Sequence, residues 1–115
     1  MPHNKPLLSF IELTPFAKAR EAYALADTEF AELQTYLLAQ PDAGDVIPGS
    51  GGCRKLRWRS DSKGKRGGYR VIYFLRLASG HVVLVLLYGK NVRDNIEPQL
   101  LKHLKEAYDN EQDDG

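Results

Sequence analysis

The sequence predicts an α+β domain with a mostly antiparallel sheet and helices packed on one face of that sheet. Apolar residues recur at helical spacing early in the chain and again near its end. Between these stretches, three short apolar runs are separated by turn-forming residues. The resulting order, β-α-α-β-β-β-α, is typical of helices laid against a sheet. The chain has 115 residues, so we expect a single domain over residues 1–115.

The first third of the chain carries the signals of one strand and two helices. Leu7–Leu13 is a short apolar run that suits a first strand. Thr14 and Pro15 then resemble an N-cap followed by proline at the first helical position. A second helix is expected after a cap at Asp27, because apolar residues again share one face. It should end at Gln40-Pro41.

The middle of the chain predicts a loop and then three strands. Pro41–Cys53 contains a cluster of glycine, serine and proline and is expected to be a loop. The strands are Arg54–Arg59, Tyr69–Arg76 and His81–Tyr88, and the last two are apolar on both faces, as in central strands. The linker Ser60–Gly68 is too long and too charged for a simple turn.

A last helix is predicted from apolar residues at helical spacing between Ile96 and Tyr108. Glu111–Gly115 resembles a frayed acidic tail. Cys53 is the only cysteine, which excludes an internal disulfide and any zinc site with two or more cysteines. A reducing, cytoplasmic location is the simplest interpretation, because the start resembles no secretory signal and no apolar run could span a membrane.

The net charge of +1 hides an asymmetry. Nine of the sixteen lysines and arginines lie within residues 54–76, where Asp61 is the one acid. The rest of the chain holds seven basic and fourteen acidic groups. A solvated basic edge strand is the plain explanation, since such charges protect edges from aggregation. A surface that only keeps the protein soluble would mix basic and acidic residues, however. We therefore expect a surface that binds a polyanionic partner, and RNA is the partner that we consider.

The strand Arg54–Arg59 predicts how such a surface would be built. Lys55, Arg57 and Arg59 should share one face, opposite Leu56 and Trp58, at ~7 Å intervals that resemble the spacing of phosphates along one nucleic-acid strand. Arginine suits bidentate phosphate contacts. Tyr69 is a nearby aromatic that could stack on a base. The glycine-rich basic loop with Lys63 and Lys65 offers backbone N–H groups to a phosphate but lacks the Walker A pattern.

These cations would also serve RNA cleavage through attack by the 2′-hydroxyl on the adjacent phosphorus. That route needs a base, positive charge on the phosphorane and an acid. The three histidines are poorly placed for this work, but a lysine among cations loses its proton more readily and becomes a possible base. Arginines would hold the phosphorane charge, and Tyr88 could move a proton beside an arginine. A site of this kind needs its substrate held in line by something else, which points to the ribosome.

Three ordered segments resemble the RelE/ParE toxin superfamily: Arg54-Lys55-Leu56-Arg57-Trp58-Arg59, then Gly68–Phe74, then Leu87-Tyr88-Gly89-Lys90-Asn91. The loop Asp45–Gly52 and the insertion Gly64–Gly68 resemble its HigB-like branch. The resemblance implies the same β-α-α-β-β-β-α fold and a type II toxin that cleaves mRNA in the ribosomal A site and inhibits translation. It also implies a cognate antitoxin, in this branch usually one with a helix-turn-helix DNA-binding domain.

The family's functional residues map onto this chain in part. Its two lysines on the second strand fall on Lys55 and Arg57, its arginine after Gly-Tyr falls on Arg70, and its Gly-Lys falls on Gly89 and Lys90. Asn91 replaces the following arginine, and the tyrosine expected near the start of the last helix is absent. Two alternatives therefore stay open: a ParE-like gyrase poison that is no nuclease, and an RNA- or ribosome-binding module that does not cleave.

The sequence thus predicts a site without metal or cofactor. Its catalytic residues are expected to be Lys55, Arg57, Arg66, Arg70, Tyr88 and Lys90. Its RNA-binding residues are expected to be Arg54, Arg59, Lys63, Lys65, Tyr69 and Asn91.

Overall fold

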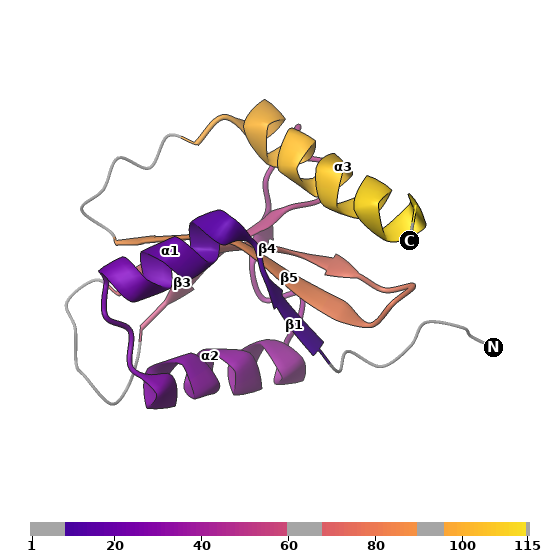
Figure 1. The fold of residues 1–115 in the computed structure, drawn as a ribbon. Helices are drawn as coiled ribbons and strands as arrows, with labels where there is room; N and C mark the ends of the chain where they lie inside the picture. The colour runs from indigo at the N-terminus through magenta and orange to yellow at the C-terminus, as the bar shows by residue number, and fades with distance from the viewer. Residues whose placement is uncertain (1–8, 60–67, 90–95, 115) are drawn as a thin grey trace.

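The computed structural model describes residues 9–59, 68–89 and 96–114 and shows the predicted α+β class (Figure 1). Its elements are, in chain order, β1 (Ser9–Glu12), α1 (Thr14–Ala22), α2 (Asp27–Ala39), β2 (Asp45–Val46), β3 (Arg54–Trp58), β4 (Tyr69–Arg76), β5 (His81–Gly89) and α3 (Pro98–Asp114). In the described part of the chain, no helix is long and apolar enough to cross a membrane.

The five strands form one mixed sheet in the order β1-β5-β4-β3-β2. β1 runs parallel to β5, whereas the other three pairs are antiparallel, so the sheet is mostly antiparallel as predicted. β4 and β5 occupy the centre and supply much of the core, because their side chains are buried on both faces.

The helices cover both faces of the sheet, so the prediction of helices on one face is wrong. Phe16 of α1 and Leu33 of α2 belong to one core cluster with the sheet. Leu101 of α3 belongs to a second cluster, with Phe74 and Val83. Figure 1 shows α3 on one side of the sheet and α1 and α2 on the other. The physical reason is that β4 and β5 carry apolar side chains on both faces, so helices must cover both faces of the sheet.

Element ends differ from the prediction by a few residues. Leu13 and Ala26, not Thr14 and Asp27, are the N-caps of α1 and α2. At α2 the cap comes from within the helix, where the Glu29 carboxylate accepts the Ala26 N–H at 3.0 Å. The last helix begins at Pro98 and continues through the region expected to fray, as far as Asp114.

β2 was not predicted, since it lies inside the expected loop Pro41–Cys53. This two-residue strand is held at its ends. Ile47 N–H donates to the Cys53 carbonyl at 2.8 Å. The Tyr73 hydroxyl accepts from Gly44 N–H at 2.9 Å and donates to the Pro41 carbonyl at 2.7 Å. A hydroxyl from a central strand thus fixes the path of the chain into β2.

Candidate nucleic-acid interface

Three predicted site residues form a row across three adjacent strands. Arg57 of β3 lies opposite Arg70 of β4, and Arg70 lies opposite Tyr88 of β5. Residues that are directly opposite in an antiparallel pair project to the same face, with Cβ atoms ~5 Å apart. Lys55 lies two residues before Arg57 on β3 and therefore joins the same face. The sheet thus gathers Lys55, Arg57, Arg70 and Tyr88, which we call the basic row.

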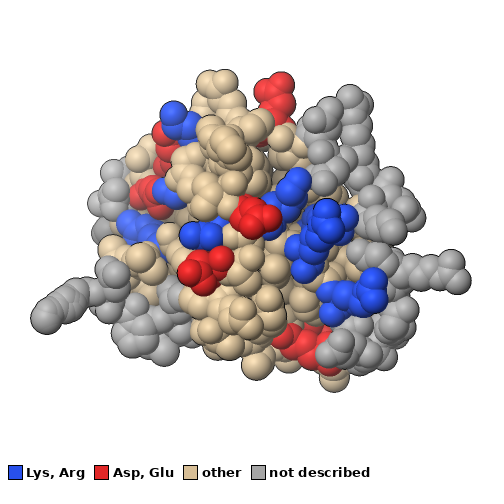
Figure 2. Space-filling view, turned by 180° about the vertical axis from the view of Figure 1, so that it is seen from behind, with Lys and Arg blue, Asp and Glu red and all other residues tan. Residues whose placement is uncertain are grey.

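The members of the basic row differ in exposure. Arg57 is exposed and forms no ion pair with any described residue, whereas Lys55 and Arg70 are half-buried. Tyr88 is only 7% exposed, because its ring belongs to the cluster beneath α3. Exposure along the row therefore decreases from the Arg57 guanidinium on β3 to the buried Tyr88 phenol on the central strand β5. Figure 2 shows neighbouring basic side chains gathered on one part of the surface, whereas acidic and basic side chains alternate elsewhere.

Arg57 and Arg70 lie directly opposite each other on one face of the sheet. Two guanidinium groups placed in this way can share one phosphate. The pair is therefore a candidate phosphate site.

A pocket of about 340 Å³ opens on this face and is lined by Ala43, Asp45, Lys55, Leu56, Arg57 and Arg70. It contains a carboxylate that the sequence-based prediction missed. Asp45 of β2 lies opposite Lys55 in the strand register, so its side chain shares the face of the basic row. Only the existence of β2 brings Asp45 here, and a two-residue strand leaves no periodic signal in the sequence. Asp45 gives the pocket a proton acceptor among cations.

Two predicted RNA-binding residues lie away from the basic row. Arg54 alternates with Lys55 and faces the α2 side, where its guanidinium donates to the Asp42 carbonyl at 3.2 Å and the Gly44 carbonyl at 2.7 Å. Tyr69 is 3% exposed and stacks on Trp58, with ring centroids 5.9 Å apart. Both residues therefore brace the fold in this structure, while their predicted contact with RNA stays untested.

Arg59 directly follows β3 and is exposed, without a described ionic partner. The predicted residues Lys63, Lys65, Arg66, Lys90 and Asn91 lie outside the described residues. Of the twelve residues predicted for the site, the described structure thus brings together four on one face and places three others beside or behind them.

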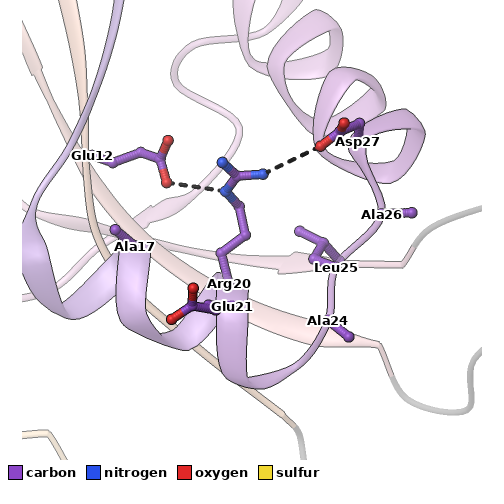
Figure 3. A pocket seen from close by; sticks show the side chains of 8 residues that line it. All are labelled: Glu12, Ala17, Arg20, Glu21, Ala24, Leu25, Ala26 and Asp27. Carbon is purple, nitrogen blue, oxygen red and sulfur yellow. Dashed lines mark hydrogen bonds and ion pairs between the residues drawn. The ribbon is translucent and has the colours of Figure 1, made fainter.

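A second pocket, of about 580 Å³, lies between β1, α1 and the start of α2 (Figure 3). One arginine and three carboxylates line it. Arg20 donates to Glu12 at 3.1 Å, reaches Asp27 at 3.8 Å and lies 4.2 Å from the centre of the Phe30 ring. This arginine is already neutralised and stacked, and the three carboxylates leave the pocket with a net negative charge that would repel a phosphate. The basic row is the better candidate site.

Other reactive groups in the described structure are held in structural contacts. His81 Nδ1 lies 2.8 Å from the Tyr108 hydroxyl, beneath α3. Burial raises the pKa of the Cys53 thiol, which keeps it protonated and a poor nucleophile. No group of three or more His, Cys, Asp and Glu side chains is arranged for a metal ion among the residues described.

Comparison with known proteins identifies the family. The model of the RelE toxin, from the RelE/RelB toxin–antitoxin system, matches residues 14–113. The chain belongs to the RelE toxin family. Membership of the HigB-like branch stays a prediction.

Two solved structures are also similar to this chain. A double arginine mutant of the E. coli toxin RelE in the free state superposes with a TM-score of 0.52 at 19% identity, covering 84% of this chain and 94% of the other. At that identity the likeness shows the shared fold. The archaeal RelE-RelB complex of Pyrococcus horikoshii gives a TM-score of 0.47 at 21% identity, covering 76% of this chain and 99% of the other.

Proposed function

We propose that this RelE-family chain is a toxin that cleaves mRNA in the ribosomal A site and thereby inhibits translation. The observation that carries the proposal is the basic row, in which Arg57 and Arg70 lie opposite each other on the same face as Lys55 and Tyr88. The Asp45 carboxylate lines the pocket on this face. These are the groups that metal-independent cleavage by a 2′-hydroxyl requires.

The proposed reaction assigns a part to each group. A base removes the proton of the 2′-hydroxyl, whose oxygen attacks the adjacent phosphorus. Arg57 and Arg70 hold the charge that develops on the phosphorane oxygens. The bond from phosphorus to the 5′-oxygen breaks, and an acid protonates that oxygen. The products are a 2′,3′-cyclic phosphate and a 5′-hydroxyl, so no water or metal ion is consumed.

Two residues are candidates for the base and one for the acid. Lys55 and Asp45 lie opposite each other at the pocket, and either could take the 2′-hydroxyl proton. Tyr88 lies opposite Arg70, so the arginine can stabilise a phenolate after the proton is given away. We propose Asp45 as the base, since the tyrosine expected near the start of the last helix is absent.

The site also explains why a ribosome would be needed. Trp58 and Tyr69, the aromatic residues next to Arg57 and Arg70 in the sequence, are at most 7% exposed and pack on each other. They are therefore closed to base stacking. The row can neutralise a phosphate, but the described residues do not fix the flanking nucleotides in line. We infer that the ribosome supplies this alignment.

An antitoxin is the expected protein partner, because the family model describes a toxin paired with an antitoxin in one system. We propose that this chain is neutralised by a cognate antitoxin, and we retain the prediction that this antitoxin carries a helix-turn-helix DNA-binding domain. We also propose that the toxin acts in the cytoplasm, because its proposed substrate is mRNA on translating ribosomes.

The chemistry is tested with an mRNA that has one 2′-deoxynucleotide at a known cleavage position. Ribosomes programmed with the all-ribose mRNA should yield a fragment ending in a 2′,3′-cyclic phosphate. The deoxy substitution should abolish that cut alone, because the nucleophile is missing. Cleavage that survives the substitution would exclude 2′-hydroxyl attack, and intact mRNA in both reactions would favour the gyrase-poison or RNA-binding alternative.

A further inference from the structure

A further pocket, of about 410 Å³, lies between α2 and the end of β3. It is lined by Glu32 and Tyr36 of α2 together with Arg57, Trp58 and Arg59, and we call it the α2 pocket. Arg57 lines this pocket and also the pocket of the basic row. The two pockets therefore share one guanidinium group, and a phosphate held there would have the rest of its nucleotide within reach of the α2 pocket.

The two sides of the α2 pocket carry opposite charges. Arg57 and Arg59 are exposed and form no ion pair with any described residue, so they make the β3 side positive. Glu32 makes the α2 side negative. A ligand that is anionic throughout would be repelled by the carboxylate, whereas a nucleotide has a phosphate for the arginines and a neutral base for the α2 side.

Tyr36 supplies a surface on which a base can stack. It lies one helical turn after Glu32, so both side chains project from the same face of α2. Its side chain is 38% exposed and packs against no other aromatic ring among the described residues. An exposed tyrosine alone would mean little. Beside a carboxylate and two arginines, however, an open ring completes the set of groups that holds a nucleotide.

The Glu32 carboxylate determines which base fits. An ionised carboxylate can only accept hydrogen bonds. The Watson–Crick edge of guanine presents two neighbouring donors, N1–H and the N2 amino group, which match the two carboxylate oxygens. Adenine and cytosine present one donor beside an acceptor nitrogen, and uracil presents one donor between two carbonyl oxygens. The carboxylate repels these acceptors, so the pocket should prefer guanine.

We propose that the α2 pocket binds the guanine of a nucleotide whose phosphate is held by Arg57, with Tyr36 stacked on the base and Glu32 bonded to its Watson–Crick edge. These two residues of α2 would then determine which nucleotide lies beside the cut. Their part in choosing the codon rests on the proposed function, whereas nucleotide binding does not. One stacked base leaves the 2′-hydroxyl unaligned, so the ribosome is still required.

The first test titrates the full ¹⁵N-labelled chain with guanosine 5′-monophosphate and follows the backbone amides by NMR. The amides of Glu32, Tyr36 and Arg57 should shift together. Ribose 5-phosphate, which lacks the base, should bind ~tenfold more weakly because stacking is lost. The adenosine and uridine monophosphates should also bind ~tenfold more weakly, because each loses a hydrogen bond to a charged acceptor.

Substitutions on α2 separate base recognition from a structural role. Tyr36→Ala should weaken binding of guanosine monophosphate ~tenfold, while Tyr36→Phe should retain it. Glu32→Gln should move the preference from guanosine to adenosine monophosphate, because an amide offers one acceptor and one donor, as the adenine edge requires. Glu21→Gln is the matched control, an exposed glutamate of α1 whose loss should leave the preference unchanged.

Four results would overturn the proposal. Equal affinity for ribose 5-phosphate would mean that only the phosphate is bound. Equal affinity for the three nucleotides would mean that Glu32 reads no base. An unchanged preference in the Glu32→Gln variant would lead to the same conclusion. Shifts confined to the basic row would place the base elsewhere. If Tyr36→Ala does not fold, the comparison of ligands on the natural chain decides the question.

The ribosome assay then tests the part in codon choice. The natural chain should cut beside a guanine more often than beside other bases, and Glu32→Gln should shift the cuts toward adenine at the same position. Cutting with an unchanged base preference in this variant would refute the role of Glu32 while leaving the proposed function intact. If the natural chain cleaves nothing, the proposed function fails, and the nucleotide titrations still judge the pocket.

Discussion

Tyr73→Phe removes one hydroxyl that holds β2 in place beside the pocket of the basic row. Tyr73 is fully buried, and its hydroxyl accepts Gly44 N–H at 2.9 Å and donates to the Pro41 carbonyl at 2.7 Å. Phenylalanine keeps the ring contacts. Gly44 is buried, so its N–H would lose its partner without gaining water, which costs ~1–3 kcal/mol. The Pro41 carbonyl is half-buried and can be hydrated, so it should add little.

We therefore expect Tyr73→Phe to lower the free energy of unfolding by about 2 kcal/mol, out of the ~5–15 kcal/mol of a typical domain. Urea unfolding followed by the fluorescence of Trp58, the only tryptophan, measures the change. Tyr36→Phe is the matched control, because Tyr36 is 38% exposed, and its effect should stay within ~0.5 kcal/mol. If both variants were equally stable, the hydroxyl would not hold the loop.

Three further predictions concern stability and the site. Burial raises the pKa of Tyr73 above its ordinary value of 10.0, so the folded chain keeps a proton that the unfolded chain loses; stability should be full below about pH 10 and fall above it, and less steeply in Tyr73→Phe, as alkaline unfolding titrations would show. Gly68→Ala should cost on the order of 3 kcal/mol in urea unfolding, because the new Cβ would meet the Trp58 carbonyl oxygen at a φ of +62°; Gly52→Ala, in open space at +110°, should cost only ~1–2 kcal/mol, and equal losses would contradict the clash. Asp45→Asn should slow ribosome-dependent cleavage ~100-fold or more with unchanged unfolding, and Asp45→Glu should restore part of the rate; full activity in the asparagine variant would leave Lys55 as the base.

The elements of the fold were predictable where a periodic apolar pattern marks them. β4 and β5 carry long apolar runs, and the helices have clear apolar faces. The placement of α3 was not predicted, although the two-sided burial of β4 and β5 contained the signal. Covering one face alone would have left the Phe74 and Val83 side chains in water.

The candidate site was predictable as far as strand alternation reaches. Alternation along β3 placed Lys55 and Arg57 on one face correctly. The same rule places Arg54 on the opposite face, but charge density alone had added it to the predicted site. Asp45 was missed because it reaches the pocket through β2, and the path of β2 depends on a hydroxyl 28 residues away in sequence, at Tyr73. Tertiary contacts of that kind leave no local pattern.

The central claim is that the basic row cleaves mRNA on the ribosome. The most direct measurement is primer extension on a defined mRNA, with and without translating ribosomes, for the natural chain, Arg70→Ala and the control Lys18→Ala. Arg70 lies between Arg57 and Tyr88 in the row, whereas Lys18 is an exposed cation of α1.

We predict cuts within A-site codons that require ribosomes, that fall ~100-fold or more in Arg70→Ala and that persist in Lys18→Ala. Uncut mRNA with the natural chain, or undiminished cutting by a folded Arg70→Ala variant, would contradict the account.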